Sequence, residues 1–115
     1  MANTFKTITK AGVTSLDVIY TVAGSTTTVI LGLMLGNTTG SAITATVTLG
    51  TNTANRAGNN DEANQDVELV TSVSIPGNST LELLSGNKVV METTDTLSVT
   101  GSGSTDVALS VMEIT

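Results

Sequence analysis

Apolar and polar side chains alternate over short segments along most of this chain, which is the pattern of half-buried β-strands. The clearest alternation runs from Ala42 to Leu49, where apolar residues hold the odd positions and threonines hold 44, 46 and 48. Successive side chains of a strand point to opposite sides of its sheet. This segment therefore predicts a strand with its apolar side chains turned inward and its threonines turned outward.

The same pattern predicts a series of strands separated by Gly, Pro, Asn and Ser residues. They cover residues 3–10, 16–22, 26–36, 42–49, 67–75, 79–84, 88–92, 95–100 and 106–114. Short strands at spacings of roughly 8 to 12 residues are typical of two packed sheets. The prediction is an all-β chain, an antiparallel β-sandwich or jelly roll of about eight strands in a single domain over residues 1–115.

Two segments depart from simple alternation. In 16–22, period 2 predicts that Leu16, Val18, Tyr20 and Val22 share one face of a strand. The stretch from Val29 to Leu35 is apolar on both faces, which predicts a central strand that is covered on each side or meets another chain. Exposure of Ile30 and Met34 would favour the second interpretation.

Two regions are expected to lie outside the body of the sandwich. Residues 1–12 form an edge strand or an N-terminal arm that carries two lysines and no acid, and the ten carboxylates of the chain begin at Asp17. Residues 51–66 contain no apolar residue larger than alanine, and they predict a long polar loop. Long loops of this kind often carry binding contacts.

Composition narrows the range of functions. Threonine occupies 23 positions, whereas His, Cys and Trp are absent. Without an imidazole or a thiol, no general base or nucleophile pair stands out, so we expect no enzyme and no cofactor. A net charge of −6 with four basic residues argues against nucleic-acid binding. The first residues lack the apolar core of a secretion signal, and no apolar run reaches membrane-spanning length, so no membrane association is expected.

One group of side chains is of the type that binds cations. Asp61, Glu62, Asn64 and Asp66 place four oxygen-bearing side chains within six residues. Ca²⁺ takes 6 to 8 oxygen ligands, but the spacing is not that of an EF-hand loop. A solvated acidic loop and a weak cation site both fit these residues, and no metal is assigned.

The second half of the chain resembles small virion proteins of tailed bacteriophages, particularly marine and cyanobacterial ones. The resemblance runs from Val73 to Thr115, with the short segments 86–90 (Gly-Asn-Lys-Val-Val) and 95–99 (Asp-Thr-Leu-Ser-Val) inside it. Residues 17–24 and 30–37 look like the N-terminal half of the same family. The asparagine-rich segment 51–66 departs from the family pattern, and the resemblance implies no catalytic motif.

The resemblance implies a structural virion protein, most simply a capsid decoration or cement protein that bridges neighbouring major capsid subunits. Its implied partners are the major capsid protein or other virion proteins, and it implies a homo-oligomer, a trimer being one option, on the capsid surface. A tail, neck or fibre-adaptor protein is the alternative within this class. A carbohydrate-binding or cell-surface-binding β-sandwich module is the alternative outside it.

Contact with a partner is expected at the arm and the long loop. The following residues are the candidates: Thr4, Phe5, Lys6, Ile8, Lys10, Asn52, Arg56, Asn59, Asn60 and Asp61.

Overall fold

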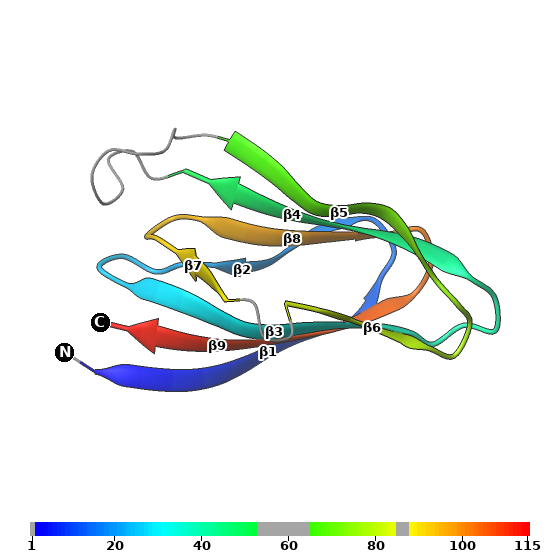
Figure 1. Ribbon diagram of the computed structural model, residues 1–115, viewed down its shortest axis with the longest axis horizontal. Coiled ribbons are helices and arrows are strands. Elements are labelled where there is room, and N and C mark those ends of the chain that lie inside the picture. The colour runs from blue at the N-terminus through cyan, green and yellow to red at the C-terminus, as the bar shows by residue number, and fades with distance from the viewer. Residues whose placement is uncertain (1, 53–64, 85–87) are drawn as a thin grey trace.

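The protein is described here by a computed structural model that covers residues 2–52, 65–84 and 88–115. Two antiparallel sheets pack face to face, and the two chain termini lie together at one end (Figure 1). The nine strands are β1 (Asn3–Val13), β2 (Leu16–Thr21), β3 (Thr27–Asn37), β4 (Ile43–Thr51), β5 (Gln65–Ile75), β6 (Thr80–Leu83), β7 (Val89–Met91), β8 (Thr96–Gly101) and β9 (Thr105–Ile114). The predicted all-β class is confirmed.

The strand pairing makes this sandwich a jelly roll. One sheet has the order β1-β9-β3-β6, with β7 also pairing β3, and the other has the order β2-β8-β4-β5. Strand β1 pairs with β9, β2 pairs with β8, and β4 pairs with β5. The chain therefore folds as one long antiparallel ribbon that rolls into two sheets. Strand β7, predicted as residues 88–92, is a short addition along the same edge as β6, and it is the ninth strand beside the eight of a jelly roll.

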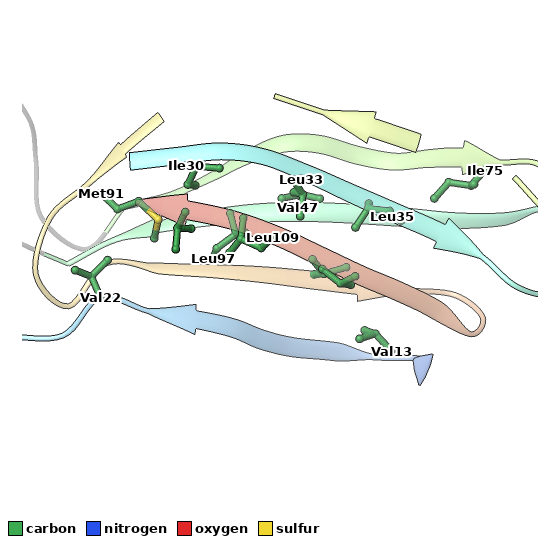
Figure 2. Close-up of a cluster of buried hydrophobic side chains, with 14 of the residues drawn as sticks. Val13, Val22, Ile30, Leu33, Leu35, Val47, Ile75, Met91, Leu97 and Leu109 are labelled. Carbon is green, nitrogen blue, oxygen red and sulfur yellow. The ribbon is translucent and has the colours of Figure 1, made fainter. Parts of the chain in front are cut away.

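The core lies between the two sheets and is aliphatic (Figure 2). Leu33 and Leu35 of β3 and Leu109 of β9 face Val47 of β4 and Leu97 of β8, and each is at most 1% exposed. The predicted inward positions of β4 are confirmed, because Ile43, Ala45 and Val47 are buried while Thr44 is exposed. Burial of these side chains is the main stabilising contribution to such a fold.

Two β-bulges change which residues face outward. The register shifts between Val18 and Tyr20 in β2. Tyr20 therefore turns inward with Val22, whereas Leu16 and Val18 stay outside at 66% and 52% exposure. The predicted common face for these four residues is wrong, because a bulge inserts one extra residue and reverses the alternation.

A similar shift lies between Ile30 and Gly32 in β3. Ile30 is fully buried in the core, but Met34, four residues later, is 47% exposed on the outer side. The condition set for contact with another chain, exposure of both residues, is therefore met by Met34 alone, because the bulge places the two residues on opposite faces. Strict alternation in a sequence cannot place a bulge whose extra residue is itself apolar.

The predicted boundaries of the arm and the loop change in the structure. Residues 3–13 pair with β9 along their length, so they form an edge strand of the five-stranded sheet, the first of the two predicted options. Thr51 pairs with Gln65 and Gly50 pairs with Asp66, so both ends of the predicted loop 51–66 belong to strands. Backbone hydrogen bonds extend these strands without apolar side chains, which is why the hydropathy pattern misses them.

One buried polar residue ties two turns together. Asn37, 3% exposed, donates from Nδ2 to the carbonyl oxygens of Ser41, Ile75 and Pro76 at 2.8, 2.9 and 3.1 Å. Its Oδ1 accepts from the backbone N–H of Thr39 at 2.9 Å. The end of β3 is thereby fixed against the link from β5 to β6, since a buried amide is stable only when hydrogen-bonded.

Candidate functional site

The candidate site residues of the N-terminal strand divide between the two sides of the sheet. Phe5 points outward and is 72% exposed. Lys6, Ile8 and Lys10 pair with the inward-facing positions 111, 109 and 107 of β9, so they point toward the interior side of the edge. Ile8 packs against the core. These residues therefore do not form one contact surface.

Both lysines of β1 take part in ion pairs within the chain. Lys6 Nζ lies 2.8 Å from Glu113 Oε1, and Lys10 Nζ lies 3.5 Å from Asp17 Oδ2 of β2. Inward-pointing charges on an edge strand oppose pairing with a further strand, because a second sheet edge would have to bury them. Lys6 and Lys10 are therefore placed to protect the edge strand from pairing with another strand.

Glu113 also connects the two sheets through Tyr20. The Tyr20 hydroxyl donates to Glu113 Oε2 at 2.5 Å, and it lies 2.7 Å from Thr28 Oγ1. Because the phenol has one proton, the Thr28 hydroxyl donates to the phenol oxygen. The ammonium of Lys6 and the Tyr20 hydroxyl hold the pKa of Glu113 below its usual value, while burial and the bond to Glu113 raise the pKa of Tyr20 to about 12.

Asn52 is held in place by a turn between β7 and β8. Its backbone N–H donates to Asp95 Oδ1 at 2.8 Å, and its Nδ2 donates to the carbonyl oxygen of Thr94 at 2.9 Å. Asp95 is fully buried and also accepts from the backbone N–H of Glu92 at 3.0 Å. Asn52 directly follows β4, whose C-terminal end lies at the end of the sandwich that carries the termini (Figure 1). Arg56, Asn59, Asn60 and Asp61 lie outside the described residues.

Of the four candidate cation ligands, only Asp66 belongs to the described residues. Asp61, Glu62 and Asn64 lie outside the described residues, and Asp66 is an exposed residue of β5. Among residues 2–52, 65–84 and 88–115, no three acidic side chains gather as a metal site would require. The same residues include no helix long and apolar enough to cross a membrane.

The outer face of the five-stranded sheet carries a row of apolar side chains, of which Phe5 is predicted from the sequence as a contact candidate and Val29 as part of a segment that could meet another chain. Cross-strand pairing aligns Phe5 with Met112, Met112 with Val29, and Val29 with Val90 across four strands. Phe5 and Val90 are 72% and 53% exposed, and Met112 and Val29 are half-buried. With Ile114 beside Met112, these five residues form what we call the apolar face.

The cross-strand row of Phe5, Met112, Val29 and Val90 itself contains no carboxylate. Glu82 and Asp106 belong to the same side of the sheet, but they pair with Met34 and Gly36 near its other end. There, a hollow of about 370 Å³ lies beside the exposed Met34, with Ala11, Ala108 and Gly36 in its wall. Thr7, Ser110 and Gly32 lie between this hollow and the Phe5 row, so the two are separate features. An exposed row of apolar side chains on a small acidic protein is typical of a protein contact.

The outer face of the four-stranded sheet has a different character. One cross-strand row contains Val18, Ser98, Thr48 and Glu68, in the order of strands β2, β8, β4 and β5. The row on one side contains Leu16, Thr100 and Thr46, and the row on the other contains Thr96, Gly50 and Asp66. We call this surface the hydroxyl face, and most of these residues line a hollow of about 710 Å³.

The three strips of the hydroxyl face follow its strands. Aliphatic side chains lie on β2, hydroxyls on β8 and β4, and carboxylates on β5. The alternating threonines of β4 predict such an outward strip, but Ser98 and Gly50 become part of a site only through the pairing of β8 with β4. No single stretch of sequence signals this surface.

Comparisons with known proteins place the chain in no family. No family description and no curated protein matches it. Among solved structures, a protein of Bacillus endospore appendages, described as disulfide-linked pili, is similar with a TM-score of 0.48 and 15% identity. The match covers 99% of this chain and 87% of that one. At this level of likeness the pilus protein carries no argument about the function of this chain.

Proposed function

We propose that this protein is a structural component of a tailed-phage virion, a decoration protein that adheres to the outer surface of the capsid. The observation that carries the proposal is the apolar face, with Phe5, Met112, Val29 and Val90 in one cross-strand row. The phage resemblance of residues 73–115 indicates a virion as the setting, and the major capsid protein is the proposed partner.

The charge distribution supports an orientation on the capsid. In a chain of net charge −6, the four residues of the Phe5 row are all uncharged, so the row itself can contact another protein without burying an unpaired charge. The hydroxyl face on the opposite side keeps its polar groups in water. Many copies, each bound weakly to the repeating capsid lattice, would together resist expansion of the shell.

The first test is the copy number of this protein in purified virions, measured by quantitative mass spectrometry against the major capsid protein. A ratio near that of the capsid subunits supports decoration. A few copies per particle would instead support the tail, neck or fibre-adaptor alternative, and absence from the particle would overturn the virion proposal.

The second test asks whether the apolar face makes the contact. In binding to shells that lack this protein, the Phe5→Ser, Val90→Ser double variant should lose at least about tenfold in affinity, since truncation of central apolar anchors typically costs 2 kcal/mol or more. The Leu16→Ser, Val18→Ser double variant is the matched control on the opposite face and should bind normally. If the Phe5→Ser, Val90→Ser variant bound the shells as tightly as the control variant does, the apolar face would be excluded as the capsid contact.

A further inference from the structure

We infer that the hydroxyl face is a binding site for neutral polyhydroxylated ligands of the saccharide class, seated in the hollow over β8 and β4. This activity goes beyond the proposed structural role, because it uses the sheet that points away from the capsid. The inference rests on the shape of the floor, on hydroxyls without partners, and on the two different borders of the hollow.

The floor of the hollow is low because two of its central positions carry little or no side chain. Ser98 of β8 lies between Val18 and Thr48, and Gly50 of β4 lies between Thr96 and Asp66. A Cβ at Gly50 would come within 2.6 Å of Thr96 Oγ1 and 3.3 Å of Asp66 Oδ1. The side chains of Thr96 and Asp66 thus reach over the glycine, and only a residue without a Cβ leaves them undisturbed there.

The floor also carries unused hydrogen-bonding capacity. Ser98 is only 9% exposed, yet its hydroxyl has no hydrogen-bond partner within the described part of the chain. The hydroxyls of Thr48, Thr96 and Thr100 likewise have no partner there, whereas Thr46 Oγ1 accepts from the backbone N–H of Ser72 at 2.8 Å. Buried hydroxyls are normally hydrogen-bonded. Ser98 departs from this rule, whereas Thr48, Thr96 and Thr100 are only half-buried. Together these four hydroxyls in adjacent rows can donate to and accept from a ligand that itself presents several hydroxyls.

The borders of the hollow select the ligand class. Leu16, 66% exposed on β2, offers an aliphatic surface for the C–H face of a sugar ring. Asp66 and Glu68 on β5 add carboxylate oxygens that accept from ligand hydroxyls, in strong charge-assisted bonds. The same carboxylates repel sulfated or uronic-acid ligands. Hydroxyls outnumber carboxylates on the floor, which favours a neutral polyol over a cationic peptide.

The test is a titration of the ¹⁵N-labelled full chain with neutral hexasaccharides of glucose and mannose, followed by amide chemical shifts. We expect fast-exchange shifts at residues 48, 98 and 100, with dissociation constants on the order of 1 mM because the contacts are few and open to water. Hexagalacturonate and pentalysine are the charged probes, and neither should shift these amides. Stronger binding of pentalysine would overturn the inference in favour of a basic peptide.

Variants separate this site from the rest of the protein. Ser98→Val fills the floor of the hollow and removes the hydroxyl, so the affinity for the hexasaccharide should fall at least about tenfold. Because valine is favoured in strands, the midpoint of thermal unfolding should be unchanged or raised. Phe5→Ser on the opposite sheet is the matched control and should bind the hexasaccharide normally. If no neutral hexasaccharide shifts these amides at 20-fold the expected dissociation constant, the inference is wrong, whatever the outcome of the capsid experiments.

Discussion

The two outer faces of the sandwich differ although the sheets that carry them are built alike. On the five-stranded sheet, the outward positions 5, 29, 90 and 112 are apolar. On the four-stranded sheet, the outward positions 46, 48, 96, 98 and 100 are Thr or Ser. The fold constrains inward side chains through packing, whereas outward side chains are free to vary with the surroundings of each face. The difference between the faces therefore points to two different contacts.

The largest expected effect is the loss of stability on truncating a core leucine, and it tests whether the two sheets contribute equally to the core although their outer faces differ. Leu33 of β3 and Leu97 of β8 are 1% and 0% exposed, one from each sheet. Replacing either by alanine should lower the free energy of unfolding by about 2–5 kcal/mol through lost burial and a cavity. Urea denaturation measures the free energy of unfolding of both variants. The control Val18→Ala, at an exposed position, should change that free energy by no more than about 0.5 kcal/mol. If only one of the two leucine variants were strongly destabilised, the two sheets would contribute unequally to the core.

The next effect concerns the link between the sheets. Tyr20→Phe removes the hydroxyl that joins Glu113 to the fully buried Thr28. The free energy of unfolding should fall by about 1–3 kcal/mol, because buried polar partners lose a hydrogen bond. Denaturation in urea provides the measurement, with Thr21→Ser as a control at the exposed neighbouring position. An unchanged value would show that the bridge contributes nothing to holding the sheets together.

A reciprocal exchange sharpens the contrast between the faces. Val29 and Thr48 are half-buried outward residues on the third strand of each sheet order, and Val and Thr have nearly the same shape. Val29→Thr should weaken capsid binding several-fold and leave saccharide shifts unchanged, and Thr48→Val should do the reverse. Each should alter the free energy of unfolding by about 0.5 kcal/mol or less. If either variant affects both activities, the two faces do not act separately.

The smallest effects are pH dependences at the edge that joins β1 to β2. The pKa of Tyr20 is raised from 10.0 to about 12, so the neutral phenol contributes stability that is complete below pH 10 and lost as pH rises toward 12. The free-energy advantage of wild type over Tyr20→Phe should shrink over that range. An advantage that is constant to pH 12 would contradict the assignment.

At acid pH the dependence of stability on pH has the opposite sign, because the pKa of Glu113 is lowered rather than raised. The pKa of Glu113 is lowered from 4.5, first by the hydrogen bond from Lys6 and then by that from Tyr20. Its contribution is present above pH 4.5 and is lost as pH falls below that value. The difference in unfolding free energy between wild type and Glu113→Gln should shrink in acid, and denaturant melts between pH 6 and pH 2 would detect it.

Much of the fold could be read from the alternation of side chains. The nine predicted segments agree with the nine strands to within a few residues at each end. The inward set of β4 is correct because its alternation is unbroken. Segments with bulges were misread, since Leu31 and Ile19 are apolar extra residues that leave the sequence pattern intact while reversing the faces.

Less of the candidate site could be predicted. Phe5 was named as a contact residue, but its companions in the row, Val29, Val90 and Met112, lie 24 to 107 residues away along the chain. Lys6 and Lys10 were named for their charge, and the structure places both in ion pairs within the chain.

The sequence by itself determined an all-β, acidic, cysteine-free chain and where its strands lie, because these properties depend on composition and on neighbours along the chain. Tertiary structure alone decided the jelly-roll pairing, the register across each sheet and the side that every bulged strand shows to water. Register sets which distant residues meet, and a shift of one residue turns a strand's side chains to the other face. The apolar face and the hydroxyl face exist only at that level.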